Sequence, residues 1–525
     1  MLNLRAVERD QLMLMPPSLR EWLPAGHLAW FILDVVAELD LSGFYGGMRS
    51  DGRGGASYDP GLMVGVLFYG YCIGERSSRR IERRLVEDVA FRVVAANQCP
   101  DHATLARFRR THQEAIAGLF AQVLGLCAAG GLISSGVVAI DGTKIEADAS
   151  GSQTRTRRRI AEEVLVEAEE TDAAEDETFG DRRGDELPEP WIDSRDRRTR
   201  LREALRQLDA DGPADPETHR AVREAKEAEL GHKLPGRKPD PDARWGKKAK
   251  SRMANVTDPD SRVLKDRRRY MQGYNAQAAV TEDQMIVAAE MTNSARDSTI
   301  FRHMVTAAER NLTGAGAMRP EAFLADAGYW SGDNAGMECD AQILIAPMPA
   351  TSDITDPDDP RLAERQAIIE QLDRAEISIT EAAAQIGVSK TWARKLLANH
   401  RHGGQDPVQL RARMLERLHS PDGAAAFAKR GITVEPVFGN LKANLGYRRF
   451  SRRGFTAVAS EWRLICTAHN LLKLHRQQPA TGRTHQTRPT LNRPTQLAIS
   501  RGRNQRSWPG AIHATASIRG VFGGR

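Results

Sequence analysis

The sequence has few cysteines, and they are too far apart to suggest a metal or disulfide site. Its 525 residues contain five, at positions 72, 99, 127, 339 and 466, and none forms a Cys-x-x-Cys pair. The thirteen histidines show no zinc-ligand spacing, and no glycine-rich loop of the nucleotide-binding type occurs. These absences argue against a zinc knuckle, a disulfide framework and a nucleotide hydrolase, and they fit a reducing compartment.

Long apolar segments are also missing. The longest apolar run, PGLMVGVLFYGYCIG, is too short and too rich in glycine to span a bilayer. The chain starts with MLNLRAVERDQLMLMPP, which carries charges where a secretory signal needs an apolar core. We therefore expect a soluble, cytoplasmic protein without a membrane partner.

Positive charge is modest in total but clustered along the chain. The formal charge is +6 and the isoelectric point is near 9.1. Lys and Arg gather at 76–84, 107–110, 155–159, 237–252, 262–269 and from 448 onward. One such cluster is ordinarily solvated surface, whereas repeated clusters favour a polyanionic partner.

The first 130 residues predict an N-terminal all-α domain, 1–130. Apolar residues recur at helical spacing in HLAWFILDVVAEL, DPGLMVGVLFYGYC and TLARFRRTHQEAIAGLFAQVLGLC. A turn at Pro100–Thr104 leads into a helix that we expect to carry Arg107, Arg109 and Arg110 on its first turns. Arginines at a helix start suit contact with phosphate.

The next regular segments predict an α/β core at 135–350 and 415–475, a mixed sheet with flanking helices. A β-branched run ends at Asp141-Gly142, and GYNAQAAV, TEDQ and MIVAAEMT read as a hairpin. A helix, the strand of EAFLADAG, a second helix and the strand of AQILIAPMP follow. A charged segment rich in Arg, Glu and Ala interrupts this order at 151–250 and predicts a helical insertion.

A second interruption, 361–400, has the pattern of a helix-turn-helix. Small residues at 382–384 precede the turn Gly387-Val388-Ser389, and the next helix directs Lys390, Arg394 and Lys395 outward. A plain helical hairpin is the alternative. Beyond the core, residues 476–525 are rich in arginine and predict a disordered basic tail.

Two aspartates lie at the ends of predicted strands. Asp141 and Asp326 each have a glycine within two residues, which lets the backbone turn away from the sheet. Exposed strand ends are where α/β folds place their chemistry, and neighbouring strands would bring both side chains to one edge. A lone aspartate in this setting is more often a turn residue.

A third acid, Glu435, precedes a proline and a basic stretch. We expect Thr433 to cap a helix with Pro436 in its first turn, which would present Glu435 off the apolar stripe. Lys442, seven residues later, would share its face, with Arg448 and Arg449 beyond. The alternative is an acid that only complements the helix dipole.

Three converging carboxylates would suit a pair of divalent cations. Two ions about 3.5–4 Å apart are a standard device for phosphodiester chemistry. Mg²⁺ fits this role because it takes only one or two protein carboxylates and keeps its other positions for water and phosphate. Without cations, clustered acids would repel one another and raise their pKa values. We therefore predict two Mg²⁺ ions, with Mn²⁺ as the substitute.

Three segments together resemble a known family. AIDGTKIEADAS, FLADAGYWS and TVEPVFGNLKANLGYRRFSRRG are similar to the Asp, Asp, Glu motifs of insertion-sequence DDE transposases with a ribonuclease-H-like catalytic core. The resemblance runs from about residue 20 to 475. It implies that Asp141, Asp326 and Glu435 are the catalytic residues and bind the metals.

The family's Tyr-Arg-Glu-Lys signature group also has counterparts here. Phe427, Arg430, Glu435 and Lys442 take these positions, with phenylalanine in place of tyrosine. Glu435 and Lys442 fit the signature best. The same family usually carries an insertion of strands before this helix, unlike the helix-turn-helix expected here.

The resemblance implies transposition of DNA. The protein would bind the terminal inverted repeats of its element, cleave the strands and join the 3′ ends to target DNA, as a homodimer on double-stranded DNA. The expected DNA-binding residues are Lys442, Arg430, Arg448, Arg449, Arg107, Arg109, Arg110, Lys390, Arg394 and Lys395. A metal nuclease without strand transfer and a catalytically inactive DNA-binding repressor are the alternatives.

Overall fold

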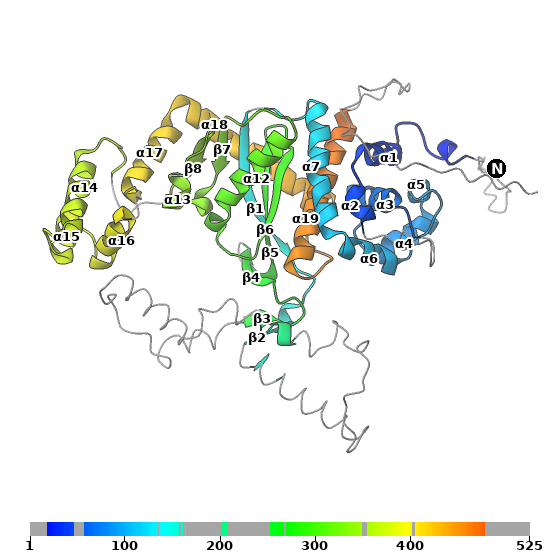
Figure 1. The fold of residues 1–525 in the computed structure, drawn as a ribbon, viewed down its shortest axis with the longest axis horizontal. Coiled ribbons are helices and arrows are strands. Elements are labelled where there is room, and N and C mark those ends of the chain that lie inside the picture. Colours follow the sequence, from blue (N-terminus) through cyan, green and yellow to red (C-terminus); the bar gives the residue numbers. More distant parts are fainter. Residues whose placement is uncertain are drawn as a thin grey trace, which may run out of the picture. The chain divides into compact units, whose positions relative to one another are not determined.

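A computed structural model describes most of the chain outside two long segments. The described residues are 18–46, 57–134, 136–156, 159–160, 163, 201–204, 206, 253–266, 269–348, 354–401 and 405–477. They form a mixed α/β fold (Figure 1). Most of the predicted insertion at 151–250 and nearly all of the predicted tail at 476–525 lie outside the described residues.

The N-terminal part is helical, as predicted. Its elements are η1 (Leu19–Glu21), α1 (Leu28–Glu38), α2 (Ser42–Tyr45), α3 (Pro60–Cys72), α4 (Ser78–Glu87), α5 (Val89–Val94), α6 (His102–Thr111) and α7 (Gln113–Ala129). Helix α3 begins with Pro60 at its first position and is capped by Asp59. It is apolar on nearly all sides and almost wholly buried, which is the pattern of a central helix.

One six-stranded mixed sheet lies at the centre of the fold. Its strands are β1 (Val137–Glu146), β4 (Arg262–Asp266), β5 (Arg269–Thr281), β6 (Ile286–Thr292), β7 (Ala322–Ala325) and β8 (Gln342–Ile345). The order is β4-β5-β1-β7-β8, with β6 also paired to β5. Strands β1, β7 and β8 are parallel, and β5 is antiparallel to its neighbours. The predicted hairpin is therefore confirmed as β5 and β6.

Strand β1 is longer than predicted. It continues past Asp141 to Glu146. The reason is its partner: β5 has 13 residues and pairs with β1 from Val138 opposite Thr281 to Glu146 opposite Gly273. The backbone beyond Asp141 thus keeps hydrogen-bond partners, so the expected break at Gly142 is wrong. A separate two-stranded sheet joins β2 (Thr154–Thr156) and β3 (Met253–Asn255), next to η2 (Gly151–Gln153).

Alternate residues of the strands serve two cores on the two faces of the sheet. On one face, Val137 and Ala139 join a large cluster with the N-terminal helices and α19 (Phe455–Gln477). On the other, Val138 and Ile140 pack with α12 (Phe301–Gly314). Helix α7 lies beside α19 (Figure 1), so the N-terminal helices share their core with the sheet.

The remaining helices follow β6 and β7. They are η4 (Asp297–Thr299), η5 (Ala327–Tyr329), α13 (Gly332–Ala335), α14 (Pro360–Asp373), α15 (Ile379–Ile386), α16 (Lys390–Arg401), α17 (Pro407–His419), α18 (Pro421–Gly439) and the π-helical turn η6 (Asn440–Asn444). Within the described ranges, no helix combines the length and apolarity needed to cross a bilayer.

Helix α18 starts well before the predicted position. Ser420 caps it, Thr433 is buried in its interior, and Pro436 lies inside it. The alanine-rich turns from 421 to 428 are good helix formers and extend the helix in the N-terminal direction. Pro436 is exposed, so water can reach the backbone carbonyl that its missing N–H leaves without a partner. The expected cap at Thr433 is therefore wrong.

We predict that Asn470→Ala weakens the packing of α19 on the sheet. Asn470 is fully buried, and its side chain accepts a hydrogen bond from Ile286 N and donates one to Ile286 O. Its loss leaves two buried backbone groups unpaired, which should lower the free energy of unfolding by roughly 2–4 kcal/mol. Thermal and urea unfolding measure this effect. Asn444→Ala, at an exposed site, is the control, and equal stabilities for the two variants would contradict the prediction.

Candidate functional site

Asp141 and Asp326 lie side by side at one edge of the sheet. Strands β1 and β7 run parallel, with Ala139 opposite Leu324. Each aspartate follows its paired residue by two positions, so both point to the same face of the sheet. This is the face on which α18 packs against β1 and β7. The structure thus brings together two of the three predicted acids.

Arg430 of α18 faces the first of these carboxylates. Its Nη1 lies 3.6 Å from Oδ2 of Asp141, and both side chains are mostly buried, at 22% and 23% exposure. Burial raises the pKa of Asp141 from 3.8 to about 6, and the nearby carboxylates of Asp326 and Asp297 add to the rise. The hydrogen bond from Gly142 N and the charge of Arg430 act in the opposite direction.

A third acid of this site, Asp297, was not predicted from the sequence. It lies in η4, just before α12. Its Oδ1 accepts hydrogen bonds from Asn275 Nδ2 at 2.6 Å and Gln277 Nε2 at 2.9 Å, both from buried side chains of β5. An acid in the segment SARDST resembles an ordinary helix-start residue, so no local pattern indicates its place beside Asp141.

Two glycines make room for these acids. A Cβ at Gly142 would collide with the Gln277 amide and would lie 3.0 Å from Asn275 Oδ1 and 3.1 Å from Asp297 Oδ1. A Cβ at Gly328 would lie 3.0 Å from Asp326 Oδ1 and 3.3 Å from Asp297 Oδ2. The carboxylates of Asp297 and Asp326 therefore approach the same point, and no side chain fits between them.

The structure does not bring Glu435 into this cluster. Glu435 is exposed, and its carboxylate lies along the preceding turn of α18, 3.4 Å from the position of a Cβ at Gly431. In the described part of the chain, no hydrogen bond or ion pair joins Glu435 to either aspartate. No group of three His, Cys, Asp or Glu side chains among the described residues is arranged to hold a metal ion.

The paired aspartates nevertheless have the chemistry of a divalent-cation site. Carboxylate oxygens are the ligands that Mg²⁺ and Mn²⁺ prefer, and Mg²⁺ needs only one or two of them. Asp141 and Asp326 are neighbours whose proximity raises the pKa of Asp141, and a bound cation would remove that repulsion. The donor set of Asp141 and Asp326 thus fits one such ion.

The predicted basic residues after Glu435 form hydrogen bonds or ion pairs within the chain, and they differ in how exposed they are. Lys442 Nζ donates to Lys144 O at 2.8 Å, and Arg448 Nε donates to Lys442 O at 3.1 Å. Arg449 forms an ion pair with Glu146 at 2.8 Å. Arg448 and Arg449 are both exposed, so their guanidinium groups remain accessible on the surface.

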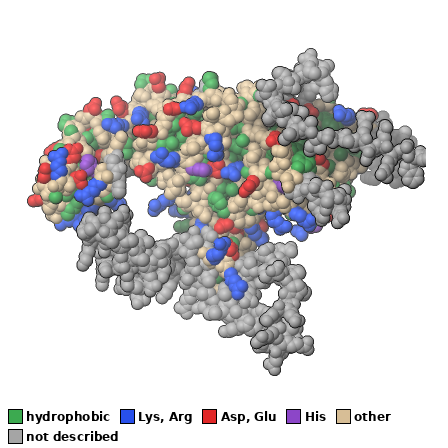
Figure 2. All heavy atoms as spheres, in the orientation of Figure 1, with side chains coloured by type: hydrophobic (Ala, Val, Ile, Leu, Met, Phe, Trp, Pro, Cys, Tyr) green, Lys and Arg blue, Asp and Glu red, His purple; other side chains and the backbone are tan. Residues whose placement is uncertain are grey.

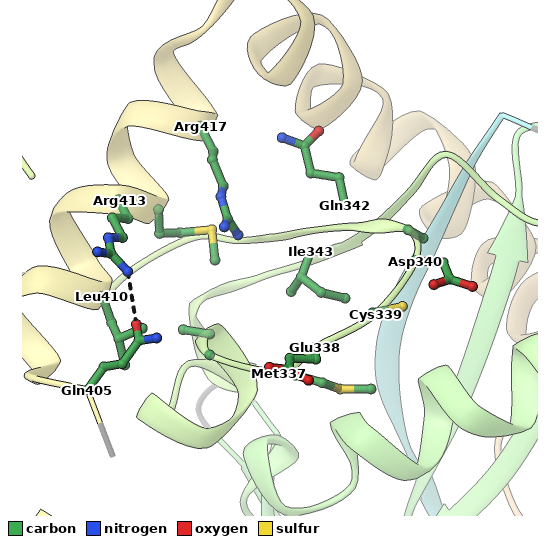
Figure 3. A pocket seen from close by; sticks show the side chains of 14 residues that line it. Met337, Glu338, Cys339, Asp340, Gln342, Ile343, Gln405, Leu410, Arg413 and Arg417 are labelled. Atoms are coloured by element: carbon green, nitrogen blue, oxygen red, sulfur yellow. Dashed lines mark hydrogen bonds between the residues drawn. The ribbon is translucent and has the colours of Figure 1, made fainter. Parts of the chain in front are cut away.

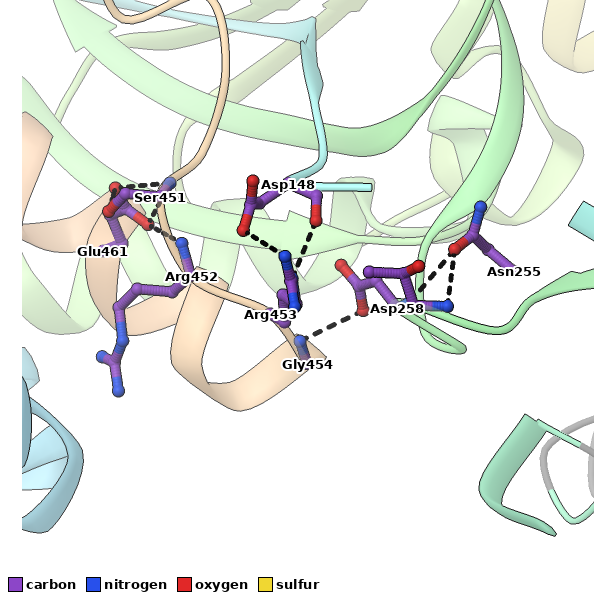
Figure 4. A network of polar contacts seen from close by, with 9 residues as sticks. Asp148, Asn255, Asp258, Ser451, Arg452, Arg453, Gly454 and Glu461 are labelled. Carbon is purple, nitrogen blue, oxygen red and sulfur yellow. Dashed lines mark hydrogen bonds and ion pairs between the residues drawn. The ribbon is translucent and has the colours of Figure 1, made fainter. Parts of the chain in front are cut away.

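Three acids hold the loop at 451–454 that follows these residues (Figure 4). Glu461 of α19 is buried and accepts hydrogen bonds from Ser451 N and Arg452 N. Asp148 pairs with Arg453 at 3.0 Å, and Asp258 accepts from Gly454 N at 3.1 Å. Asp258 is thus structural, and the loop is tied to three different parts of the chain.

The predicted basic start of helix α6 is wrong in two respects. Arg109 and Arg110 lie in its last turn, where positive charge complements the helix dipole. Arg109 is 7% exposed and donates to Tyr71 Oη at 3.2 Å and Arg76 O at 2.9 Å, so it is not available as a surface contact. Arg107 and Arg110 are exposed, and Figure 2 shows Lys and Arg side chains gathered over the helices around α4 and α6.

The chain also has a hollow of about 530 Å³ between α17 and the segment that joins α13 to β8 (Figure 3). Its lining includes Glu338, Asp340, Arg413 and Arg417. Arg413 donates to Gln405 across its rim at 3.2 Å. None of the predicted site residues lines this hollow, so the paired aspartates remain the candidate site.

We predict that Gly142→Ala disturbs the site from within. The added methyl group would displace the Gln277 amide and its hydrogen bond to Asp297, at roughly 1–3 kcal/mol of stability. Urea unfolding measures the change. Gly118→Ala in α7 is the control, since a Cβ there meets nothing within 4 Å and alanine favours a helix. A Gly142→Ala variant as stable as the control would contradict the described geometry.

The raised pKa of Asp141 predicts how stability changes with pH. The folded chain holds this proton up to about pH 6, whereas the unfolded chain releases it near 3.8. Ionisation therefore destabilises the fold progressively between these values, by at most roughly 3 kcal/mol. In EDTA, Asp141→Asn should unfold at a higher temperature than the parent at pH 8, and this advantage should disappear near the ordinary pKa of aspartate.

Differential scanning calorimetry at several pH values would follow this advantage. The exposed substitution Asp333→Asn provides the control, with the same change of charge and no contact with the cluster. An Asp141→Asn variant that is less stable than the parent at high pH would refute repulsion as the dominant effect. Such a result would show that the contact of Asp141 with Arg430 stabilises the fold by more than burial and carboxylate repulsion destabilise it.

Comparison with known protein families matches two separate parts of the chain. Residues 17–111 match the family described as Transposase domain (DUF772), and residues 389–475 match the family described as Transposase DDE domain. The second match includes Glu435 and Lys442 but neither aspartate. No curated protein and no solved structure gives a significant match. The two matches indicate a transposase and support a relationship to the DDE transposases.

Proposed function

From these two matches and the paired aspartates, we propose that the chain is a DDE transposase that cuts and joins DNA. It would bind the terminal inverted repeats of its element, cleave the strands at the ends and transfer the 3′ ends to target DNA. The observation that supports this most is the position of Asp141 in β1 beside Asp326, which directly follows the parallel strand β7, together with an arginine of the transposase-matched segment that faces Asp141.

The catalytic core would be ribonuclease-H-like. The sheet has three antiparallel strands, β6, β5 and β1, followed by parallel β7 and β8, with helices on both faces. An acid within β1 and an acid directly after β7 are in keeping with the fold that the sequence resemblance implies. Helix α18, which packs across β1 and β7, would complete the site.

Each side chain of the site has a role in this proposal. Bound Mg²⁺ or Mn²⁺, two ions in all, would activate the attacking oxygen and stabilise the leaving oxygen. Asp141 and Asp326 would hold these ions, and Glu435 would reach them from α18 by leaving the turn at Gly431. Arg430 offsets the charge of Asp141 while no cation is bound.

The signature positions on α18 are part of the same proposal. Phe427 packs against the large core, and Arg430, three residues later on the same side of the helix, faces Asp141. Lys442 lies in the π-helical turn and bonds to the backbone of β1 at Lys144. The helix carrying Glu435 is thereby held to the strand carrying Asp141.

Double-stranded DNA would be held by the exposed cations around this edge. Arg448 and Arg449 follow α18 and η6, and Arg107 and Arg110 lie on α6. Such contacts to phosphates position the duplex and weaken with salt. Two ends must be brought together for transfer, so the active form on DNA would be a homodimer.

The test is cleavage of DNA that carries the inverted repeats bordering the gene. Asp141→Asn, Asp326→Asn and Glu435→Gln should each abolish strand cleavage in Mg²⁺, while gel-shift binding in EDTA stays within about twofold of the parent, because phosphate contacts provide most of the affinity. Glu416→Gln, an exposed glutamate on α17, should leave cleavage intact. Retained cleavage in any of the three variants would remove that residue from the site.

Two other functions predict different products in the same assay. A metal nuclease would cut the ends without joining them, so strand-transfer products would be absent. A DNA-binding repressor would bind the repeats without cutting, and the parent would have no activity for these substitutions to remove. The repressor is favoured by one observation: among the described residues, no group of three His, Cys, Asp or Glu side chains is arranged to hold a metal ion.

A further inference from the structure

Helices α14, α15 and α16 form a compact unit of their own. All three pack against one another, around Ile368, Leu372 and Ala382. Helix α15 starts with a capping box, in which Ser378 and Glu381 bond to each other's backbone. The sequence 378–381 thereby fixes the first turn without help from the sheet.

The turn between α15 and α16 is equally well defined. Gly387 adopts φ 75° and ψ 33°, the left-handed conformation that favours glycine. Its N–H bonds to Ala384 O and the N–H of Val388 bonds to Ala383 O, which together make a Schellman motif. Ser389 then accepts a hydrogen bond from Trp392 N at the start of α16. A three-residue turn with glycine is typical of a helix-turn-helix.

Helix α16 has one buried face and one cationic face. Ala393, Leu396 and Leu397 point into the unit. Lys390, Thr391, Arg394, Lys395 and Ala398 are exposed, and helical geometry places them within about 140° of one another. The helix contains no acid.

Within the part of the chain that the structure describes, the cations of this face have no acidic partner, unlike the arginines elsewhere in the unit. The surface of the unit carries both signs of charge (Figure 2). Its paired arginines are Arg361 with Asp359, Arg365 with Asp406, Arg374 with Glu370 and Glu376, and Arg401 with Asp373. Among the described residues, no ion pair involves Lys390, Arg394 or Lys395, and Lys395 lies over the Trp392 ring at 5.8 Å.

We propose that α16 enters the major groove of duplex DNA and reads base sequence there. This inference rests on the proposed function only for its choice of DNA as the polyanion. A helix of about 10–12 Å diameter fits a major groove about 12 Å wide, and the second helix of a helix-turn-helix is the one that enters it. An acidic protein segment would satisfy the charge but would not require this turn.

The position of each side chain on the exposed face of α16 determines whether it would contact base edges or phosphates. Of the three cations, Arg394 lies nearest the centre of the exposed face, so it would contact base edges, where guanine offers two acceptors. Lys390 lies at the opposite margin from Lys395. Thr391 and Lys395 lie at one margin and would contact phosphates. The chain would then read sequence at α16 in addition to any contact made by the N-terminal helices.

The experiment selects binding sites from a library of duplexes with random centres, using the full chain in EDTA so that cleavage plays no part. Affinity is then measured for the selected duplex and for an unrelated duplex of equal length. Arg394→Ala should lower the ratio of these affinities about 10- to 100-fold. Lys395→Ala should weaken both duplexes alike and reduce the salt dependence by about one phosphate contact.

Arg374→Ala is the matched control, an exposed arginine of the same unit with acidic partners, and it should change neither affinity. Circular dichroism of all variants should match the parent, because Arg394 and Lys395 are exposed. The proposal is overturned if Arg394→Ala leaves the ratio unchanged, weakens both duplexes equally, or has the same effect as Arg374→Ala. Failure of the cleavage test above would not alter any of these results.

Discussion

The parallel pairing of β1 with β7 is the constraint on which this site depends. It fixes two carboxylates next to each other at the edge of the sheet, where mutual repulsion would favour their protonation or separation. The fold opposes this with nearby donors and a cation: Gly142 N and Gly328 N bond to the two aspartates, and Arg430 faces one of them. The pair remains close because backbone register, which side-chain rotation cannot change, sets its spacing.

The orientation of α18 about its own axis determines which of its side chains faces Asp141 and Asp326. Arg430 and Glu435 are five residues apart, so they project about 140° from each other. Val434, Val437 and Leu441 are buried and fix the helix with Arg430 toward Asp141. Lys442 then bonds to the backbone of β1 and fixes the far end. The helix thus presents a positive charge to the aspartates and leaves the glutamate on the solvent side.

Local patterns in the sequence were sufficient to predict the elements that carry Asp141 and Asp326. Each acid ends an apolar run of strand type and precedes a glycine, and these signals do not depend on distant parts of the chain. The length of β1 could not be predicted in this way, because it follows from the length of β5. The sequence predicts a start of α18 that is too late, because Pro436 has the pattern of a first-turn proline although it lies inside the helix.

Other features depend on contacts between distant residues, which one sequence does not reveal. Asp297 joins the site through amides of β5 that lie 20 and 22 residues away. Arg109 resembled a surface cation, yet Tyr71 and Arg76 supply the acceptors that keep it inside. The helix-turn-helix could be predicted from the sequence because its turn is made by consecutive residues. The structure places Lys390, Arg394 and Lys395 on the exposed face of α16, as expected.

The contacts of α19 with β6 have a consequence for how copies of this chain can associate. A strand at the margin of a sheet ordinarily offers unpaired backbone groups to a strand from another molecule. Here Asn470 occupies both groups of Ile286, and Arg463 donates to Ala289 O. Addition of a strand from another molecule is therefore blocked at these positions of β6, so this edge of the sheet is protected against edge-to-edge aggregation.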